Sequence, residues 1–176
     1  MRLDVSYKKQ LTRWSCSLAC LEMVANFYGE AIDQVELFAR LKRPVRGHKG
    51  EWCVRNDDVV AEARKLGLRA DYILVNFTDP ADMMRTISQH IDQNIPLIAT
   101  QRTSMQSPFG HSRLIVGYEE SGEDAERKVV LHDPAAFPAH GVPQGGASRI
   151  WKADIFAGMW KPNLSVHGGV AIRIQK

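Results

Sequence analysis

The sequence predicts an α+β fold in a single domain, residues 1–176, because helical patterns come first and strand patterns follow. Three helix-like segments occupy about residues 1–67, which we expect to form a helical lobe. Short apolar runs typical of antiparallel strands dominate about residues 68–176, which we expect to form a sheet lobe. A length of 176 residues fits one domain made of two closely packed lobes.

The first helix is predicted over residues 15–28, with Gly29 as its stop. Its apolar positions cover a wide face, so we expect this helix to be central and buried. These positions are Leu18, Ala19, Leu21, Met23, Val24, Phe27 and Tyr28.

Two further helices complete the predicted helical lobe. One covers residues 33–41 and is followed by a loop rich in glycine and proline. The other is predicted to begin with Asn56 or Asp57 as its N-cap and to end at Gly67.

The sheet lobe is predicted to open with a strand over residues 68–77. A helix then starts at Pro80, a residue suited to the first helical position, and ends near Asn94. Residues 134–149 are rich in Pro, Gly and Ala and predict a loop, before a short helix over residues 152–159. Four more strands are predicted over residues 96–101, 111–119, 129–133 and 169–174.

Composition and charge exclude several classes of protein. The chain is 44% hydrophobic and 24% charged, which is typical of globular rather than disordered or fibrous proteins. A net charge of +3 does not favour nucleic acid as a partner, and no apolar run is long enough for a membrane span. Three cysteines are too few for a disulfide framework and fit a reducing compartment. The N-terminal residues lack an apolar signal core, so we expect a cytoplasmic protein, or a secreted effector exported without a Sec signal peptide.

Cys16 is the candidate nucleophile. It falls in the first turn of the predicted apolar helix, where free N–H groups and the helix dipole favour a thiolate over a thiol. Cys20 lies one turn further along the same face, and core packing explains it best.

His111 and Asp133 are the candidate base and its orienting group. His111 follows Gly110 at the start of an apolar strand, and Asp133 ends the next predicted strand. If the two strands are neighbours, Asp133 can hold the imidazole in the orientation that catalysis needs. His132 should point to the opposite side of its strand, because side chains alternate along a strand.

Gln10 is the candidate oxyanion donor. It precedes Cys16 by six residues, and a side-chain amide near a nucleophile can donate a hydrogen bond to a developing oxyanion. The backbone N–H of Cys16 is the natural second donor. The order Gln, Cys, His, Asp is far more specific than any of these residues alone.

At these residues the chain resembles papain-like cysteine peptidases. The most similar branch is the compact bacterial one, which includes the bacteriocin leader-processing peptidase domains of ABC exporters and is related to secreted effector proteases. The matching residues are Gln10, Cys16, Gly110-His111, Gly117-Tyr118 and Asp133-Pro134. The likeness covers roughly residues 5–135, and Ser15 and Ser17 replace the Asp and Gly that usually flank the Cys in exporter domains.

The resemblance implies a papain-like fold, in which a lobe carrying the nucleophile helix packs on an antiparallel sheet. It implies a cysteine protease that hydrolyses a peptide bond in a peptide or protein substrate, without a cofactor or a metal. By the same resemblance, Cys16 is the nucleophile, His111 the base, Asp133 the orienting residue and Gln10 the oxyanion donor.

Three alternatives stay open from the sequence. The same triad can serve an acyltransferase or amidase acting on a non-protein substrate, because either an amine or water can resolve a thioester. A catalytically inactive domain of the same fold can bind a peptide. A metal site built from Cys16, Cys20 and histidines is the weakest of the three, since the chain lacks the paired ligand motif of structural zinc.

Overall fold

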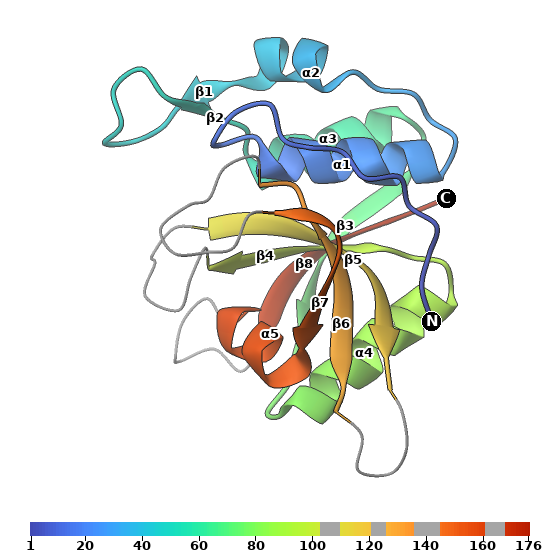
Figure 1. The fold of residues 1–176 in the computed structure, drawn as a ribbon. Helices are drawn as coiled ribbons and strands as arrows, with labels where there is room; N and C mark the ends of the chain where they lie inside the picture. The colour runs from blue at the N-terminus through green and yellow to red at the C-terminus, as the bar shows by residue number, and fades with distance from the viewer. Residues whose placement is uncertain (103–109, 121–125, 136–144, 161–167) are drawn as a thin grey trace.

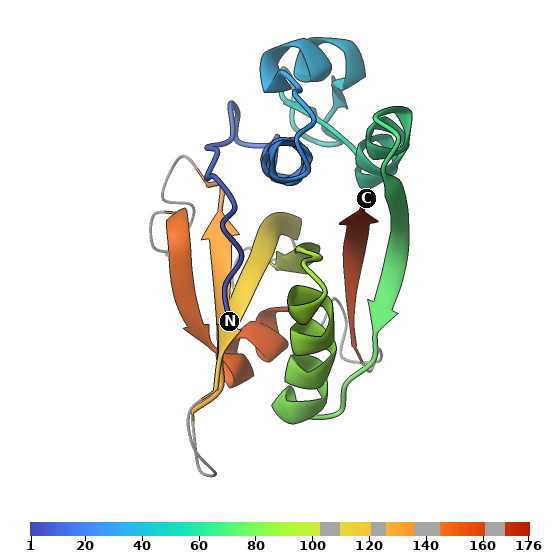
Figure 2. The ribbon, with the colours of Figure 1, turned by 90° about the vertical axis from the view of Figure 1, so that its right-hand side faces the viewer.

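Three helices lie above a curved antiparallel sheet in the computed structural model, which describes residues 1–102, 110–120, 126–135, 145–160 and 168–176 (Figures 1 and 2). The three are α1 (Cys16–Phe27), α2 (Gln34–Leu41) and α3 (Asn56–Lys65). Of the others, α4 (Pro80–Asp92) lies inside the curve of the sheet, and α5 (Ala153–Trp160) packs against α4. Helices followed by antiparallel strands confirm the predicted α+β class.

The main sheet has the strand order β3-β8-β4-β5-β6-β7 within the described residues, and all neighbouring strands are antiparallel. Gln101 pairs with His111 across β4 and β5, so the end of β4 and the start of β5 meet at one end of the sheet. The strands are β3 (Arg69–Val75), β4 (Leu97–Arg102), β5 (Gly110–Glu119), β6 (Lys128–Asp133), β7 (Gly146–Lys152) and β8 (Gly169–Gln175).

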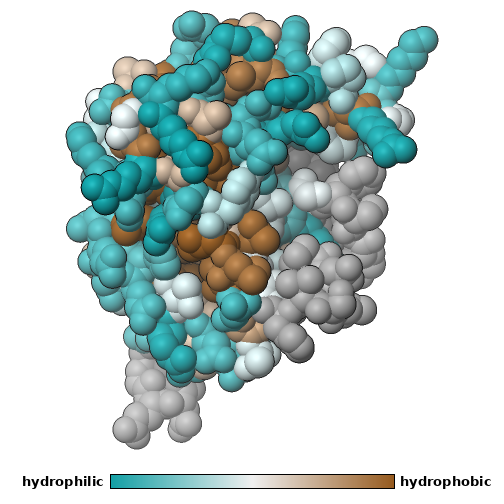
Figure 3. Space-filling view, turned by 180° about the vertical axis from the view of Figure 1, so that it is seen from behind, coloured by the Kyte–Doolittle hydropathy of each residue, from teal (hydrophilic) through white to brown (hydrophobic). Residues whose placement is uncertain are grey.

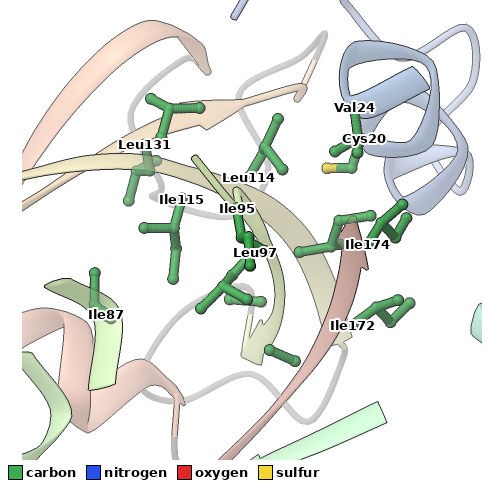
Figure 4. Close-up of a cluster of buried hydrophobic side chains, with 14 of the residues drawn as sticks. Cys20, Val24, Ile87, Ile95, Leu97, Leu114, Ile115, Leu131, Ile172 and Ile174 are labelled. Carbon is green, nitrogen blue, oxygen red and sulfur yellow. The ribbon is translucent and has the colours of Figure 1, made fainter. Parts of the chain in front are cut away.

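Helix α1 is the centre of the helical layer, as the apolar pattern predicted. Most of its residues are buried, and Gly29, with a φ of 83°, ends the helix in a conformation that favours glycine. Cys20 and Val24 point from α1 toward sheet side chains that include Leu114 and Ile174 (Figure 4). Cys20 is fully buried in this apolar cluster, in agreement with the core role predicted for it.

Two segments differ from the predicted elements. Residues 146–149 were predicted as loop but belong to β7, an edge strand whose side chains are mostly exposed or half-buried and therefore lack a clear apolar period. The loop predicted after α2 contains a short ribbon, in which β1 (Arg43–Pro44) pairs with β2 (Trp52–Cys53). The rest of the predicted loop, residues 136–144, lies outside the described residues.

The N-terminus of α3 also differs from the prediction. Arg55 is its N-cap, and Asn56 is already helical. The Asn56 side-chain amide donates to the Thr100 hydroxyl at 3.0 Å instead of capping the helix. The carboxylates of Asp57 and Asp58 in the first turn still complement the helix dipole.

Two irregularities in the sheet lie close to the candidate site. The register between β6 and β7 shifts between Leu131 and Asp133, and Ser148 on β7 has a φ of 53°. A bulge of this kind changes the direction in which nearby side chains point. Here it lies beside Asp133, at the end of β6.

The surface is mainly hydrophilic on the face seen from behind, with hydrophobic residues gathered near its middle (Figure 3). Exposed apolar side chains on the edge strand β3 are Tyr72 and Leu74. No helix in the described ranges is both long and apolar enough to cross a membrane.

Candidate active site

Cys16 is the first residue of α1, the helix that lies above the sheet (Figure 1). Ser15 precedes it as the N-cap residue, but its hydroxyl bonds back to the backbone of Thr12 and does not cap the helix. The first-turn N–H groups of α1 are therefore left without a side-chain cap. Their partial positive charge favours an anion at Cys16.

His111 comes next to Cys16 from the start of β5. Its Nε2 lies 2.6 Å from Oδ1 of Asp133, and a side-chain hydrogen bond also connects His111 with the Cys16 thiol. The backbone N–H of Ser112 also donates to the Cys16 Sγ, at 3.4 Å. The structure thus brings Cys16, His111 and Asp133 together in the order that the sequence predicted.

The thiol is poised to ionise near neutral pH. Burial raises the pKa of Cys16, but the hydrogen bond and positive charge of His111, together with the Ser112 N–H, outweigh burial and lower this pKa to about 7. By contrast, burial raises the pKa of Cys20 well above its ordinary value. Of these two cysteines on α1, only Cys16 can supply a thiolate.

The imidazole is held in a state that can accept and return a proton. Burial lowers the pKa of His111, but the hydrogen bonds to Asp133 and to Cys16 outweigh burial and raise it. The positive charge of Arg113 acts in the opposite direction and lowers the pKa of His111.

Asp133 is a buried carboxylate whose two oxygens have separate partners. Oδ1 accepts from His111 and from the Ala135 N–H at 3.0 Å, and Oδ2 accepts from Nε of Arg113 at 2.8 Å. Burial alone raises the pKa of Asp133, but the hydrogen bond and charge of His111, with the charge of Arg113, hold it well below its usual range. Asp133 is therefore ionised, and its contacts fix its orientation.

Arg113 is the residue of this cluster that sequence reasoning missed. It is fully buried in the middle of β5 and lies two residues after His111 on the same side of the strand. The only signal in the sequence is its position: Arg113 directly precedes the apolar run Leu114-Ile115-Val116 and lies two residues after His111.

Gln10 lies buried in the segment before α1. Its backbone N–H donates to the carbonyl of Pro134 at 2.9 Å, and this bond ties the segment to the chain just after Asp133. The side-chain Nε2 donates to the carbonyl of Thr12 at 2.8 Å, which uses one of its two N–H groups. Oε1 is buried and has no hydrogen-bond partner among the described residues.

His132 faces away from this cluster, as strand alternation predicted. One ring nitrogen lies 2.7 Å from the carbonyl of Val5, and the other accepts from the Ser148 N–H at 3.0 Å. The described part of the chain also contains no group of three His, Cys, Asp or Glu side chains that could hold a metal ion. The chemistry available at the site is that of an activated thiol beside an acid–base imidazole.

An α+β fold with a thiol at the start of a buried helix and an imidazole at the start of a facing strand is that of a papain-like cysteine peptidase. The chain matches the Peptidase_C39 like family over residues 2–159, and it belongs to that family. This match confirms the resemblance predicted from the sequence. Among curated proteins, none matches the chain.

Two solved structures with the same fold are a peptidase domain and a protease from transporters. The peptidase domain of Streptococcus ComA, a bi-functional ABC transporter of a quorum-sensing pathway, is 18% identical with a TM-score of 0.61, and the match covers 96% of each chain. A double-glycine-motif protease from an AMS/PCAT transporter, solved with its leader peptide, is 14% identical with a TM-score of 0.56. That match covers 99% of this chain and 94% of the other.

Proposed function

We propose that this cysteine peptidase hydrolyses a peptide bond through a triad of Cys16, His111 and Asp133. The observation that supports the triad most directly is the chain of contacts from the Cys16 thiol through the His111 ring to Oδ1 of Asp133, which ends in a 2.6 Å hydrogen bond. Nucleophile, base and orienting group come from α1, β5 and β6, three elements that pack in one core. Such a constellation is the general requirement for covalent catalysis by a thiol.

In the proposed reaction, His111 takes the proton of Cys16, and the thiolate attacks the carbonyl carbon of the peptide bond. The bond to nitrogen breaks when the imidazolium gives its proton to the leaving amine. A water molecule, deprotonated by His111, then attacks the thioester and releases the acid and the free thiolate. Asp133 keeps the imidazole oriented throughout and stabilises its charged form.

The oxyanion formed in both attacks needs donors close to Cys16. We assign this role to the Cys16 N–H, in the uncapped first turn of α1, and to the amide of Gln10, one of whose N–H groups is not used by Thr12. Loss of one such donor costs about 2.7–4 kcal/mol of transition-state stabilisation. We therefore expect Gln10→Ala to reduce kcat by about 100- to 1,000-fold.

The proposed substrate is a peptide segment of a larger polypeptide, and it is consistent with this proposal that a neighbour of the same fold was solved in complex with a leader peptide. Ser15 and Ser17 flank the nucleophile here, in place of the Asp and Gly that are usual in exporter domains. We therefore expect the cleavage preference of this protease to differ from that of an exporter domain.

The test is mass spectrometry of the products formed from a peptide library, with Cys16→Ala as the inactive variant. Cys53→Ala is the matched control, because Cys53 is also a partly exposed free cysteine but lies on β2 and not on α1. We expect new peptide termini from wild type and Cys53→Ala, and none from Cys16→Ala. Turnover by Cys16→Ala at the wild-type rate would contradict the proposal, and products joined to an added amine in place of water would identify an acyltransferase.

A further inference from the structure

The strongest unexplained feature of the site is a fully buried arginine behind it. Arg113 is 0% exposed, although its guanidinium is always charged. Removing such a charge from water is unfavourable unless hydrogen bonds and an opposite charge compensate for it. A buried arginine in the middle of a strand therefore calls for a specific reason.

The contacts of Arg113 connect it to the triad. Its Nε donates to Oδ2 of Asp133 at 2.8 Å, and its guanidinium lies 4.7 Å from the ring centroid of Trp151. One terminal nitrogen donates to Gln101 Oε1 at 3.2 Å and to the Arg102 carbonyl at 3.4 Å. The residues that contact the guanidinium therefore come from three strands, β4, β6 and β7.

The other terminal nitrogen of Arg113 is buried and has no hydrogen-bond partner in the described part of the chain. Among the contacts that the described residues make with Arg113, the shortest hydrogen bond is the one to Oδ2 of Asp133. The buried guanidinium therefore keeps a positive charge and a hydrogen bond on this oxygen.

We propose that Arg113 is a positioning residue of the peptidase: it holds Asp133 so that Oδ1 faces His111, and it neutralises most of the negative charge that His111 would otherwise face. This role rests on the proposed triad. With Oδ2 fixed by Arg113 and Oδ1 shared by His111 and Ala135, the carboxylate cannot rotate. His111 then faces a strong hydrogen-bond acceptor within a nearly neutral ion pair.

The charge balance matters because His111 must give up a proton as well as take one. A lone buried carboxylate beside an imidazolium stabilises the charged ring and makes it a weaker acid. The positive charge of Arg113 opposes this effect, so that protonation of the leaving amine stays easy. Among the described residues, Cys16 on α1 also acts on His111, and Tyr7 contacts the neighbouring Asp133, since its hydroxyl donates to the Asp133 carbonyl at 3.1 Å.

The test compares Arg113→Gln and Arg113→Lys with Arg173→Gln. Arg173 on β8 forms an ion pair with Asp71 on β3. Arg173→Gln is therefore the matched control, because it removes an arginine from an ion pair elsewhere on the sheet. The measurements are kcat and KM across pH on a peptide substrate, with circular dichroism to confirm folding. The upper limb of the kcat/KM profile reports loss of the proton from the imidazolium.

For Arg113→Gln we expect kcat to fall at least about tenfold. KM should be unchanged, since Arg113 is fully buried behind the site. The upper limb of the kcat/KM profile should move up by about one pH unit. Arg113→Lys keeps the positive charge but lacks the planar guanidinium group of arginine. The upper limb of its kcat/KM profile should therefore stay at the wild-type pH, while kcat falls. Arg173→Gln should match wild type in both respects.

Two results would overturn the proposal. One is a folded Arg113→Gln variant whose kcat and upper limb of the kcat/KM profile match wild type. The ion pair of Arg113 would then be purely structural. The other, decisive even if the Gln variant does not fold, is an Arg113→Lys variant with wild-type kcat, because the planar guanidinium group would then have no positioning role. Failure of the triad itself is distinguished by Cys16→Ala, which would then remain active regardless of Arg113.

Discussion

Two arginine–aspartate pairs lie on the same face of the sheet and differ in their access to water. Strand pairing connects Arg113 through Ala99 to Ala171 on β8, and this face also carries Arg173 and Asp71. In the inner pair the Arg113 and Asp133 side chains are 0% and 3% exposed, whereas in the outer pair the Arg173 and Asp71 side chains are 34% and 43% exposed.

The two pairs differ in geometry as well as in burial, and both differences decide what each pair contributes. The outer pair is bidentate, with Arg173 donating to both oxygens of Asp71 at 3.0 and 2.6 Å, yet water and salt screen it. In the inner pair Asp133 shares its oxygens between Arg113 and His111. Burial and the contact with His111 thus distinguish the inner pair, for which we propose a role in catalysis, from a common surface contact.

The largest effect that separates the pairs is expected from Asp133→Asn. An amide offers one oxygen to two donors, His111 and Arg113, and leaves a buried charge without its counterion. We expect kcat/KM to fall by about 10⁴-fold, the scale seen when the orienting carboxylate of a serine protease becomes an amide. The free energy of unfolding should fall by about 3–5 kcal/mol. Peptide cleavage and urea denaturation measure the two quantities.

The matched control for that change is Asp71→Asn in the outer pair. It should leave kcat/KM unchanged and lower the free energy of unfolding by at most about 1 kcal/mol. Equal losses of stability from the two substitutions would contradict the distinction drawn between the inner and outer pairs.

The second prediction concerns recovery in a double variant, Arg113→Met with Asp133→Asn. Without the guanidinium, the single amide oxygen is free to accept from His111, and no unpaired charge stays buried. We expect the double variant to cleave peptide at least about tenfold faster than Asp133→Asn, because a hydrogen bond to a charged group contributes about 1.5–3 kcal/mol. It should also be more stable than Asp133→Asn, since a buried pair can often be replaced by neutral groups without loss.

The corresponding pair of changes in the outer pair, Arg173→Met with Asp71→Asn, should show coupling below about 1 kcal/mol. A double-mutant cycle in urea denaturation gives both coupling energies. If the inner pair showed no larger coupling than the outer pair, Arg113 and Asp133 would not act as a unit.

The contrast between the pairs also shows what the sequence could and could not predict. The position of α1 was predictable because its apolar face and Gly29 are local signals. His111 and Asp133 were predictable as candidates because each begins or ends an apolar run. Their 2.6 Å contact was conditional on β5 and β6 being neighbours, a non-local fact that the fold supplies.

The features missed by sequence reasoning share a different cause. An arginine is most often a surface residue, so Arg113 on β5 reads as solvent-facing unless the strands on both sides are known. Strand β7 is an edge strand without an apolar period, and Trp151 on it covers the guanidinium. Burial of a polar group depends on which elements surround it, and that information is spread over the whole chain.

The third prediction is the pH dependence of stability. Because the pKa of Asp133 is lowered in the folded protein, its carboxylate stabilises the fold at pH values above the unfolded pKa of about 3.9, and this contribution is lost as the pH falls toward the folded pKa. We expect the free energy of unfolding to fall more steeply below about pH 5 in wild type than in the Arg113→Met/Asp133→Asn variant. Urea denaturation at several pH values provides the comparison, and parallel curves would count against an ionised Asp133.

The smallest expected effect is the salt dependence of the stability that each pair contributes. Debye screening shortens from about 10 Å at 0.1 M to about 3 Å at 1 M ionic strength and acts on charges that water reaches. The free-energy cost of Asp71→Asn, already at most about 1 kcal/mol, should therefore vanish in 1 M NaCl. The cost of Asp133→Asn should persist, because ions do not reach the space between β5, β6 and Trp151. Urea denaturation at the two salt concentrations measures both costs, and a salt-sensitive Asp133→Asn would mean that water enters behind the triad and that Arg113 is screened rather than enclosed.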